Sequence, residues 1–198
     1  MLYDDIFFRN LVAPFLIAFL AFGVAFRART HTSEKLDRMQ EGWAVLVLLR
    51  LSGLLTWIAV GVWLWNPANL AWARLELPDI FRFLGLAVGV CAIAWLMWMF
   101  RSLGRNLTDT VVTRKDAYLV TSGPYRLVRH PMYVGVFLLS VFLALVMSNW
   151  LVLILGMSVF GMMCVRLPIE ERNLIARFGD GYRAYMRTTG RFWPRIAG

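Results

Sequence analysis

Cysteine, histidine and charged residues are scarce in this sequence of 198 residues. The two cysteines, Cys91 and Cys164, lie in apolar segments and form no CxxC pair, so neither a disulfide framework nor a cysteine-based metal site is indicated. Only 17% of the residues are charged, and there are two histidines. Hydrophobic residues make up 60% and the mean hydropathy is +0.62, which excludes an ordinary soluble domain. The composition predicts an integral membrane protein.

Several catalytic motifs are also missing from the sequence. It contains no Walker-type glycine loop, no GxGxxG after a strand, no HExxH and no GxSxG. Phosphoryl transfer, Rossmann-type dinucleotide binding, zinc hydrolysis and serine hydrolysis are therefore poorly supported. The net charge of +9 does not indicate nucleic-acid binding, because the basic residues lie mostly between apolar runs, where they set membrane orientation.

Long uncharged runs dominate the first hundred residues. Residues 10–26 and 83–100 carry no charge, and residues 43–65 carry only Arg50. Each run can cross a hydrocarbon core about 30 Å thick, so three spans are expected here. Asp4 and Asp5 stand where a signal peptide would be basic, so the first run is expected to be a retained span. For Arg50, snorkelling to the interface is favoured over a contact inside the membrane.

The longest uncharged run, residues 131–165, is too long for one span. As a single helix its 35 residues would reach about 52 Å, which exceeds any bilayer. Ser148 and Asn149 lie at its middle. The run therefore predicts a tight helical hairpin with spans at 131–147 and 150–165.

The polar tail after this run has apolar residues at helical spacing. This pattern predicts one or two amphipathic helices against the membrane surface, broken near residues 179–181. The expected fold is all-α integral membrane, with five transmembrane helices followed by C-terminal amphipathic helices. A single domain covers residues 1–198: three spans in 1–100, then a polar loop, the hairpin and the tail in 101–198.

Basic residues are distributed unevenly among the loops. Seventeen of the 21 Lys and Arg residues lie in the first loop, the third loop and the tail, which share one side of a five-span protein. The positive-inside rule makes this side cytoplasmic and places the N-terminus outside. The expected location is the inner membrane of a bacterium.

The hairpin is expected to bring polar residues together at the cytoplasmic edge. Its arms are of nearly equal length, so Arg166, Glu170 and Glu171 should return to the depth of Arg129 and His130. Each residue alone has a simple alternative as a boundary charge or a first-turn carboxylate of a helix. Together, beside a long loop that is expected to be ordered, they favour a functional site.

Three stretches of sequence resemble a known enzyme family. LVTSGPY at 119–125, RHPMY at 129–133, and Arg166 with EERNLIARFGDGY at 170–182 are similar to the isoprenylcysteine carboxyl methyltransferase family. The likeness covers about the last hundred residues, whereas the first two spans carry no signature. The resemblance implies a membrane-embedded methyltransferase that uses S-adenosylmethionine, held between the loop, the hairpin and the C-terminal helices.

The resemblance also implies individual site residues. Arg166 matches an arginine associated with the acceptor group, and Glu170 matches a residue that holds the cofactor, so both are assigned to catalysis. Thr113 stands where the family has glutamine, and Leu107 where tryptophan or phenylalanine is usual. The implied cofactor contacts are Thr113, Ala117, Tyr118, Leu119, Val120, Tyr125, His130, Pro131, Met132, Tyr133 and Glu170.

The implied reaction is an in-line displacement that requires alignment and exclusion of water more than a strong base. A carboxylate acceptor is already ionised, and Arg166 would orient it. A thiol or amine acceptor would need a base, for which His130 or Glu171 comes into question. The expected partners are membrane lipids and a lipophilic small-molecule or lipid-linked acceptor from the bilayer, not nucleic acid.

Two other functions stay open on the sequence. One is an NADPH-dependent membrane reductase of the sterol-reductase kind, since that group also has an Arg-His-Pro-x-Tyr-like segment near its C-terminus. The other is a non-catalytic membrane scaffold whose edge charges only set topology. No metal site is expected.

Overall fold

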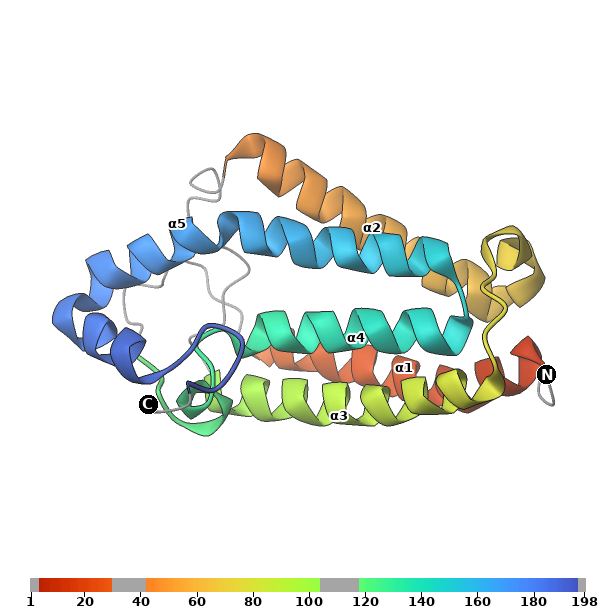
Figure 1. Cartoon of the computed structure of the whole chain (residues 1–198), viewed down its shortest axis with the longest axis horizontal. Coiled ribbons are helices and arrows are strands. Elements are labelled where there is room, and N and C mark those ends of the chain that lie inside the picture. The colour runs from red at the N-terminus through yellow and green to blue at the C-terminus, as the bar shows by residue number, and fades with distance from the viewer. Residues whose placement is uncertain (1–3, 30–41, 104–117, 196–198) are drawn as a thin grey trace.

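The computed structural model describes residues 4–29, 42–103 and 118–195, and these are built from helices. Within these ranges there is no β-strand, only two isolated β-bridges. The helices run roughly alongside one another (Figure 1), which confirms the predicted all-helical class. In chain order the elements are α1 (Asp5–Arg29), α2 (Trp43–Trp65), the 3-10 helix η2 (Pro67–Ala73), α3 (Asp79–Leu103), the 3-10 helix η4 (Gly123–Arg126), α4 (Pro131–Met147) and α5 (Trp150–Thr188).

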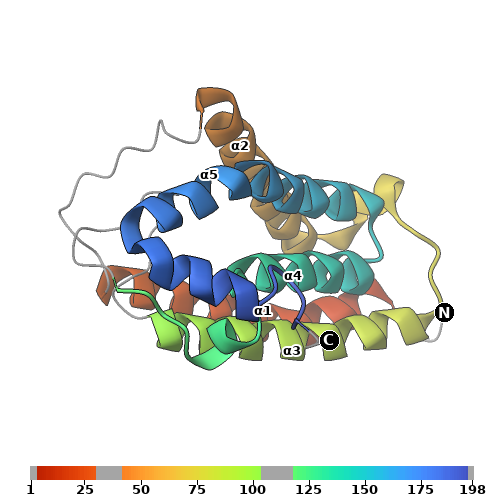
Figure 2. The same cartoon turned by 60° about the vertical axis from the view of Figure 1, so that its left-hand side comes forward.

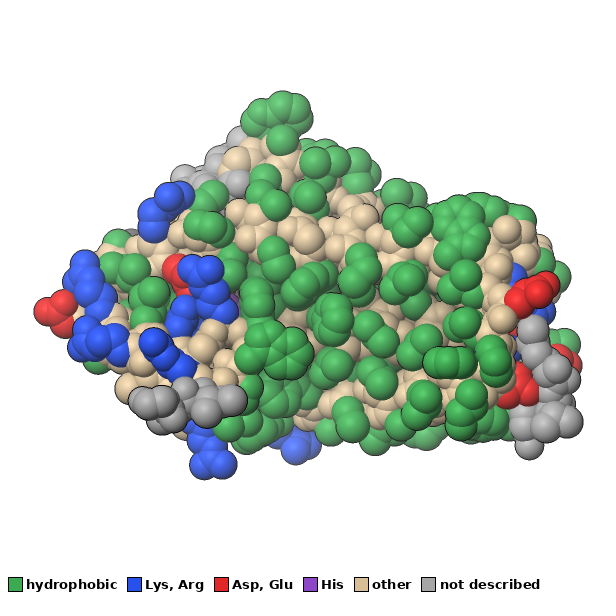
Figure 3. Space-filling model, in the orientation of Figure 1, with side chains coloured by type: hydrophobic (Ala, Val, Ile, Leu, Met, Phe, Trp, Pro, Cys, Tyr) green, Lys and Arg blue, Asp and Glu red, His purple; other side chains and the backbone are tan. Residues whose placement is uncertain are grey.

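Four of these helices, α1, α2, α3 and α5, are long and apolar enough to cross a membrane. The fifth, α4, is apolar but has only 17 residues. Hydrophobic side chains cover the middle of the surface, whereas charged side chains gather at its two ends (Figure 3). This distribution is that of an integral membrane protein. The bounds of α2 and α4 coincide with the predicted spans.

Helix α5 is longer than the sequence indicated. The apolar span was predicted to end at residue 165, but α5 continues to Thr188 and has 39 residues in all, with Pro168 inside it. Charged residues begin at Arg166, and a helix need not end where its apolar surface ends. Gly179 interrupts the helix with φ 56° and ψ −129°, within the predicted break.

Helix α4 lies between α3 and α5 (Figures 1 and 2). It approaches α3 closely because glycines leave room at the contact, as is common between membrane helices. A Cβ atom built on Gly89 would lie 2.5 Å from Phe142, and one on Gly135 would lie 2.2 Å from Leu96. On the other side, Gly156 of α5 faces Ser140 in the same way. These contacts fix the position of α4 relative to both neighbours.

The turn between α4 and α5 is held by the segment that precedes α3. Ser148 adopts the left-handed conformation with φ 44°, and the side chain of Asn149 accepts a hydrogen bond from Val152 N at the start of α5. Asn149 also donates to the carbonyl of Leu70 in η2, and Leu75 N donates to the carbonyl of Ser148 at 2.6 Å. These contacts fix the turn at Ser148 and Asn149 against η2 and the segment before α3.

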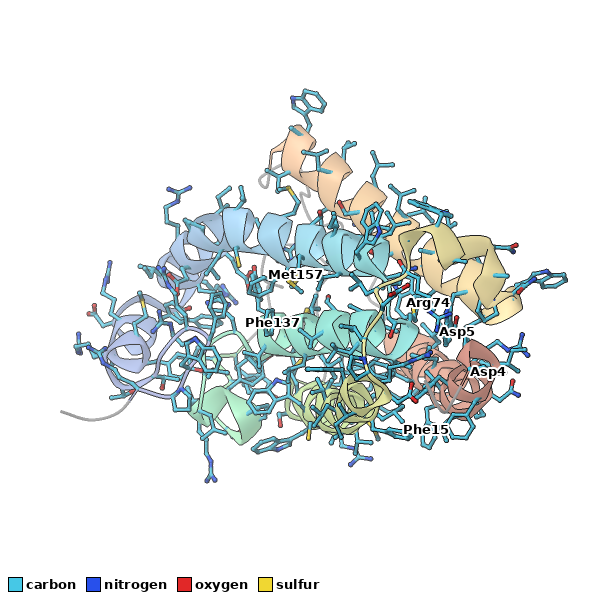
Figure 4. All side chains as sticks on the ribbon, turned by 45° about the vertical axis from the view of Figure 1, so that its right-hand side comes forward. Asp4, Asp5, Phe15, Arg74, Phe137 and Met157 are labelled. Atoms are coloured by element: carbon cyan, nitrogen blue, oxygen red, sulfur yellow. The ribbon has the colours of Figure 1, made fainter. Side chains whose placement is uncertain are left out.

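An ion-pair cluster joins α1 and α3 at this same end of the molecule. Asp5 pairs with Arg82 at 2.9 Å and with Arg74 at 3.1 Å, and Asp5 and Arg74 lie near each other in Figure 4. Arg82 is fully buried, lies 3.9 Å from the ring centre of Phe8, and donates from Nε to the carbonyl of Val146. The sequence had shown Arg82 only as the charge that bounds a span.

The opposite end of the molecule carries η4, the first turn of α4 and the last part of α5 (Figure 1). Basic side chains gather there in Figure 3. Arg129 and His130 lie immediately before α4, so the structure places them at the end where the sequence predicted a site.

Candidate functional site

His130 is buried at the start of α4 between two carboxylates of α5. Its Nδ1 lies 3.6 Å from Glu170 Oε1, and its Nε2 lies 3.4 Å from Glu171 Oε1. Burial alone would lower the pKa of His130, but hydrogen bonds and charge attraction from both glutamates outweigh it, so the pKa is raised above 6.5. The two glutamates therefore favour the positively charged imidazole more than water does for a free histidine side chain.

Glu170 is linked to α4 and to the preceding turn of α5. The Tyr133 hydroxyl donates to Glu170 Oε2 at 2.7 Å. The buried side chain of Arg166 acts on both Tyr133 and Glu170 through its positive charge. Tyr133, Arg166 and Glu170 thus form one cluster with His130. Residues about forty apart in sequence meet because α4 and α5 run in opposite directions.

Glu171 is engaged by two arginines in addition to His130. Arg129 donates to Glu171 Oε1 from Nη2 at 2.8 Å, and Arg191 donates to Glu171 Oε2 from Nη2 at 2.6 Å. Arg129 also donates to the carbonyls of Met186 and Thr189. Both carboxylate oxygens of Glu171 are therefore occupied by donors. This arrangement suits a residue that fixes its neighbours better than one that accepts a proton from a substrate.

Residues 189–192, which we call the C-terminal segment, run beside the start of α4. Arg129 N donates to the carbonyl of Gly190 at 2.8 Å, and His130 N donates to the carbonyl of Arg191 at 3.1 Å. Val128 and Gly190 form a parallel β-bridge. The sequence reading did not include this segment in the site. No spacing rule signalled it, because the contacts are made largely by main-chain atoms.

Further hydrogen bonds attach η4 to α5 and the start of α4 to α3. The Tyr185 hydroxyl donates to the carbonyl of Tyr125, and Trp95 Nε1 donates to the carbonyl of Pro131 at 2.7 Å. Burial, with the charges of Glu170 and Tyr185, raises the pKa of Tyr125 above its usual value. Tyr125 therefore stays neutral and can act as a hydrogen-bond donor.

Tyr182 contributes a buried polar atom that no described side chain or main-chain group satisfies. Its side chain is only 2% exposed, and its hydroxyl has no hydrogen-bond partner among the described residues. The charges of Glu171 and Arg129 act on this phenol. A buried hydroxyl without a partner costs about 1–3 kcal/mol. Such an atom beside charged groups indicates a place for a polar ligand or water.

The other residues implied by the resemblance differ in how deeply they are buried. Val120 is buried, Leu119 and Met132 are partly buried, and Tyr118 is largely exposed. Tyr118 therefore lies outside the buried cluster. The predictions for Leu107, Thr113 and Ala117 lie outside the described residues. Within the described ranges, no group of three or more His, Cys, Asp or Glu side chains could hold a metal ion.

Comparison with known proteins finds that the region containing this cluster matches a family model. Residues 84–176 match the isoprenylcysteine carboxyl methyltransferase (ICMT) family. The match confirms the family resemblance seen in the sequence. It extends from α3 to the middle of α5 and includes His130, Tyr133, Arg166 and both glutamates.

Individual relatives agree with the ICMT match. The chain is 30% identical to a methanethiol S-methyltransferase from Pseudomonas deceptionensis over 148 residues, which cover 70% of this chain and 55% of that protein. It is 32% identical to a protein-S-isoprenylcysteine O-methyltransferase from Schizosaccharomyces pombe over 87 residues, 42% of this chain and 37% of that protein.

A third relative is the protein-S-isoprenylcysteine O-methyltransferase of Dictyostelium discoideum. It is 35% identical over 98 residues, which cover 48% of this chain and 40% of that protein. The chain thus matches between about a third and just over half of the length of these relatives. The C-terminal segment lies beyond the region that matches the ICMT family.

Proposed function

We propose that this protein is a membrane methyltransferase that uses S-adenosylmethionine to methylate a lipophilic acceptor. The observation that carries the proposal is the buried cluster of His130, Tyr133, Arg166 and Glu170, which lies in the ICMT-matching region at one end of apolar helices. A polar cofactor and an apolar acceptor can both reach such a position. The named relatives are methyltransferases that act on either an oxygen or a sulfur acceptor.

In this proposal α4 and α5 form a helical hairpin and all five α-helices cross the membrane. The end that carries the site also carries most of the basic side chains, so it faces the cytoplasm, and the N-terminus lies outside. The part of α5 beyond Arg166 lies against the cytoplasmic membrane surface as an amphipathic helix. A bacterial inner membrane fits this orientation.

The described residues fit S-adenosylmethionine in their charges and hydrogen-bonding groups. The cofactor supplies a methyl group on a positively charged sulfur. Glu170 offers a carboxylate to the cofactor's cationic end, and His130 and Tyr125 offer hydrogen bonds. The buried Tyr182 hydroxyl has no hydrogen-bond partner among the described residues, and the cofactor can provide one. Thr113 and residues 117–120 are the further proposed contacts, together with Pro131, Met132 and Tyr133.

Arg166 is the proposed acceptor-orienting residue. Its guanidinium is buried close to Tyr133 and Glu170, and a forked cation of this kind aligns a carboxylate well. His130 and Glu171 are poorly suited as general bases, because Glu171 already binds two arginines and both ring nitrogens of His130 already face glutamate oxygens. The site therefore suits acceptors that arrive as anions, either carboxylates or thiolates.

Binding measurements in detergent test the cofactor assignment. Calorimetry with S-adenosylhomocysteine should show saturable binding, and NADPH should show none. Binding of NADPH alone would support a membrane reductase and refute the methyltransferase. Transfer of label from methyl-labelled S-adenosylmethionine to N-acetyl-S-farnesylcysteine, to methanethiol and to a membrane extract would then identify the acceptor.

Three substitutions separate the proposed roles. His130→Ala and Glu170→Ala should weaken binding of S-adenosylhomocysteine, because they remove direct cofactor contacts. Arg166→Ala should leave this affinity nearly unchanged and abolish turnover. An equal loss of cofactor affinity in all three variants would contradict this division.

A further inference from the structure

The ring of Phe192 occupies the boundary between the polar cluster and the apolar interior. It stacks on Tyr133 with ring centres 5.7 Å apart and planes 28° apart, and it meets the His130 ring at 6.3 Å. On its other side it contacts Phe160 of α5 at 6.0 Å, which in turn contacts Phe137 of α4 at 5.3 Å. Phe192 thus connects the proposed cofactor-binding residues with the facing sides of α4 and α5.

Apolar side chains from three helices surround this boundary. Tyr133, Met163 and Leu167 form a buried cluster, and the partly buried Leu49 of α2 and Phe192 pack against it. Phe137 of α4 and Met157 of α5 lie between their two helices in Figure 4. A lipophilic acceptor that reaches Arg166 from the bilayer therefore meets an apolar surface in which Phe192 lies beside Tyr133 and contacts His130.

We propose that Phe192 is a specificity-determining residue, whose side-chain size sets how large an apolar acceptor can lie beside Tyr133. The inference rests on the proposed methyltransferase function. It assigns a role to a residue outside the region that matches the ICMT family. Phe192 would act on the acceptor's apolar part, whereas Glu170 and His130 act on the cofactor.

The position of Phe192 does not depend on its own side chain. The hydrogen bonds from Arg129 N to Gly190 and from His130 N to Arg191 hold the backbone, and Arg191 pairs with Glu171 at 2.6 Å. A shorter or larger side chain at Phe192 should therefore change the space beside Tyr133 without releasing the segment. The adjacent Trp193 is 78% exposed and serves as a matched aromatic control.

The test compares Phe192→Ala, Phe192→Trp and Trp193→Ala with the unaltered protein. Calorimetry in detergent would give the affinities for N-acetyl-S-geranylcysteine and N-acetyl-S-farnesylcysteine, which differ by one five-carbon unit, and for S-adenosylhomocysteine. In Phe192→Ala the ratio of farnesyl to geranyl affinity should rise about tenfold, the lower end of what a change in an apolar contact surface achieves. In Phe192→Trp the ratio should fall, and in Trp193→Ala it should stay the same.

Three results would overturn the role of Phe192. The first is an unchanged ratio of farnesyl to geranyl affinity in Phe192→Ala. The second is binding of neither acceptor probe by any variant. The third is a loss of S-adenosylhomocysteine affinity in Phe192→Ala as large as the change for the acceptors. Failure of the unaltered protein to bind S-adenosylhomocysteine would instead count against the methyltransferase, and the ratio of the two acceptor affinities would still report on Phe192.

Discussion

Replacing Glu171 with glutamine should cost much more stability than replacing its partner Arg191. The Arg129 and Glu171 side chains are only 7% and 6% exposed, and removing one member of a buried ion pair costs about 3–5 kcal/mol because the other charge stays buried. Arg129 retains its carbonyl acceptors at Met186 and Thr189. We therefore expect Glu171→Gln to lower the free energy of unfolding by about 3 kcal/mol, the lower end of that range.

The pair between Arg191 and Glu171 should contribute far less. The Arg191 side chain is 53% exposed, and exposed pairs contribute about 0.2–1 kcal/mol because water screens them. The loss of unfolding free energy in Arg191→Gln should stay within that range. The same holds for Arg183→Gln, which breaks the exposed pair with Asp180.

Equilibrium unfolding in mixed micelles, followed by tryptophan fluorescence, measures these differences. A double-mutant cycle between Arg129→Gln and Glu171→Gln isolates the energy of that pair. If Glu171→Gln costs no more than Arg191→Gln, burial does not determine the strength of this cluster and the reasoning fails.

Three other contacts predict measurable changes. The interactions of His130 with Glu170 and Glu171 raise its pKa, so they should contribute their full stability below pH 6.5 and lose it as pH rises through the raised pKa of the folded protein. The melting temperature should therefore fall more steeply with rising pH in the unaltered protein than in His130→Asn. Gly89→Ala should lower the free energy of unfolding by about 1–3 kcal/mol, because the added Cβ atom would lie 2.5 Å from Phe142. Gly161→Ala is the control, because a Cβ atom there meets nothing within 4 Å. An equally large loss in Gly161→Ala would contradict this reasoning. Asp5→Asn should lower the free energy of unfolding by about 3 kcal/mol in the same assay, since it removes the carboxylate that pairs with the buried Arg82 at 2.9 Å. No loss would show that Asp5 does not offset that charge.

Hydrophobic pattern and turn residues predicted most of the helical architecture. The bounds of α2 and α4 followed from tryptophans, charges and a proline at the edges of uncharged runs. The end of α5 did not, because loss of apolar character marks where a membrane surface lies and not where helical hydrogen bonding stops. The meeting of His130 with Glu170 was predictable, since helices that reverse direction return to the same level.

The parts of the site that were missed depend on the main chain. The C-terminal segment is joined to the start of α4 by backbone donors and acceptors that every residue possesses, so Arg191 and Phe192 gave no distinguishing signal. The ion pairs of Arg82 were missed for a related reason. Its partner Asp5 lies in another helix, and pairing between helices depends on how they pack, which no spacing within one segment reveals.

The hydrogen bonds between the C-terminal segment and the start of α4 also bear on how the protein is made. Arg129 and its acceptor Thr189 are 60 residues apart, which a ribosome adding about 5–20 residues per second needs several seconds to synthesise. In the proposed topology, helix α4 and the apolar part of α5 are made within that interval, so they can enter the bilayer first. His130 and Glu171 can form their contacts with Arg191 only afterwards. The proposed site is therefore completed last, after the helices that carry it have been made.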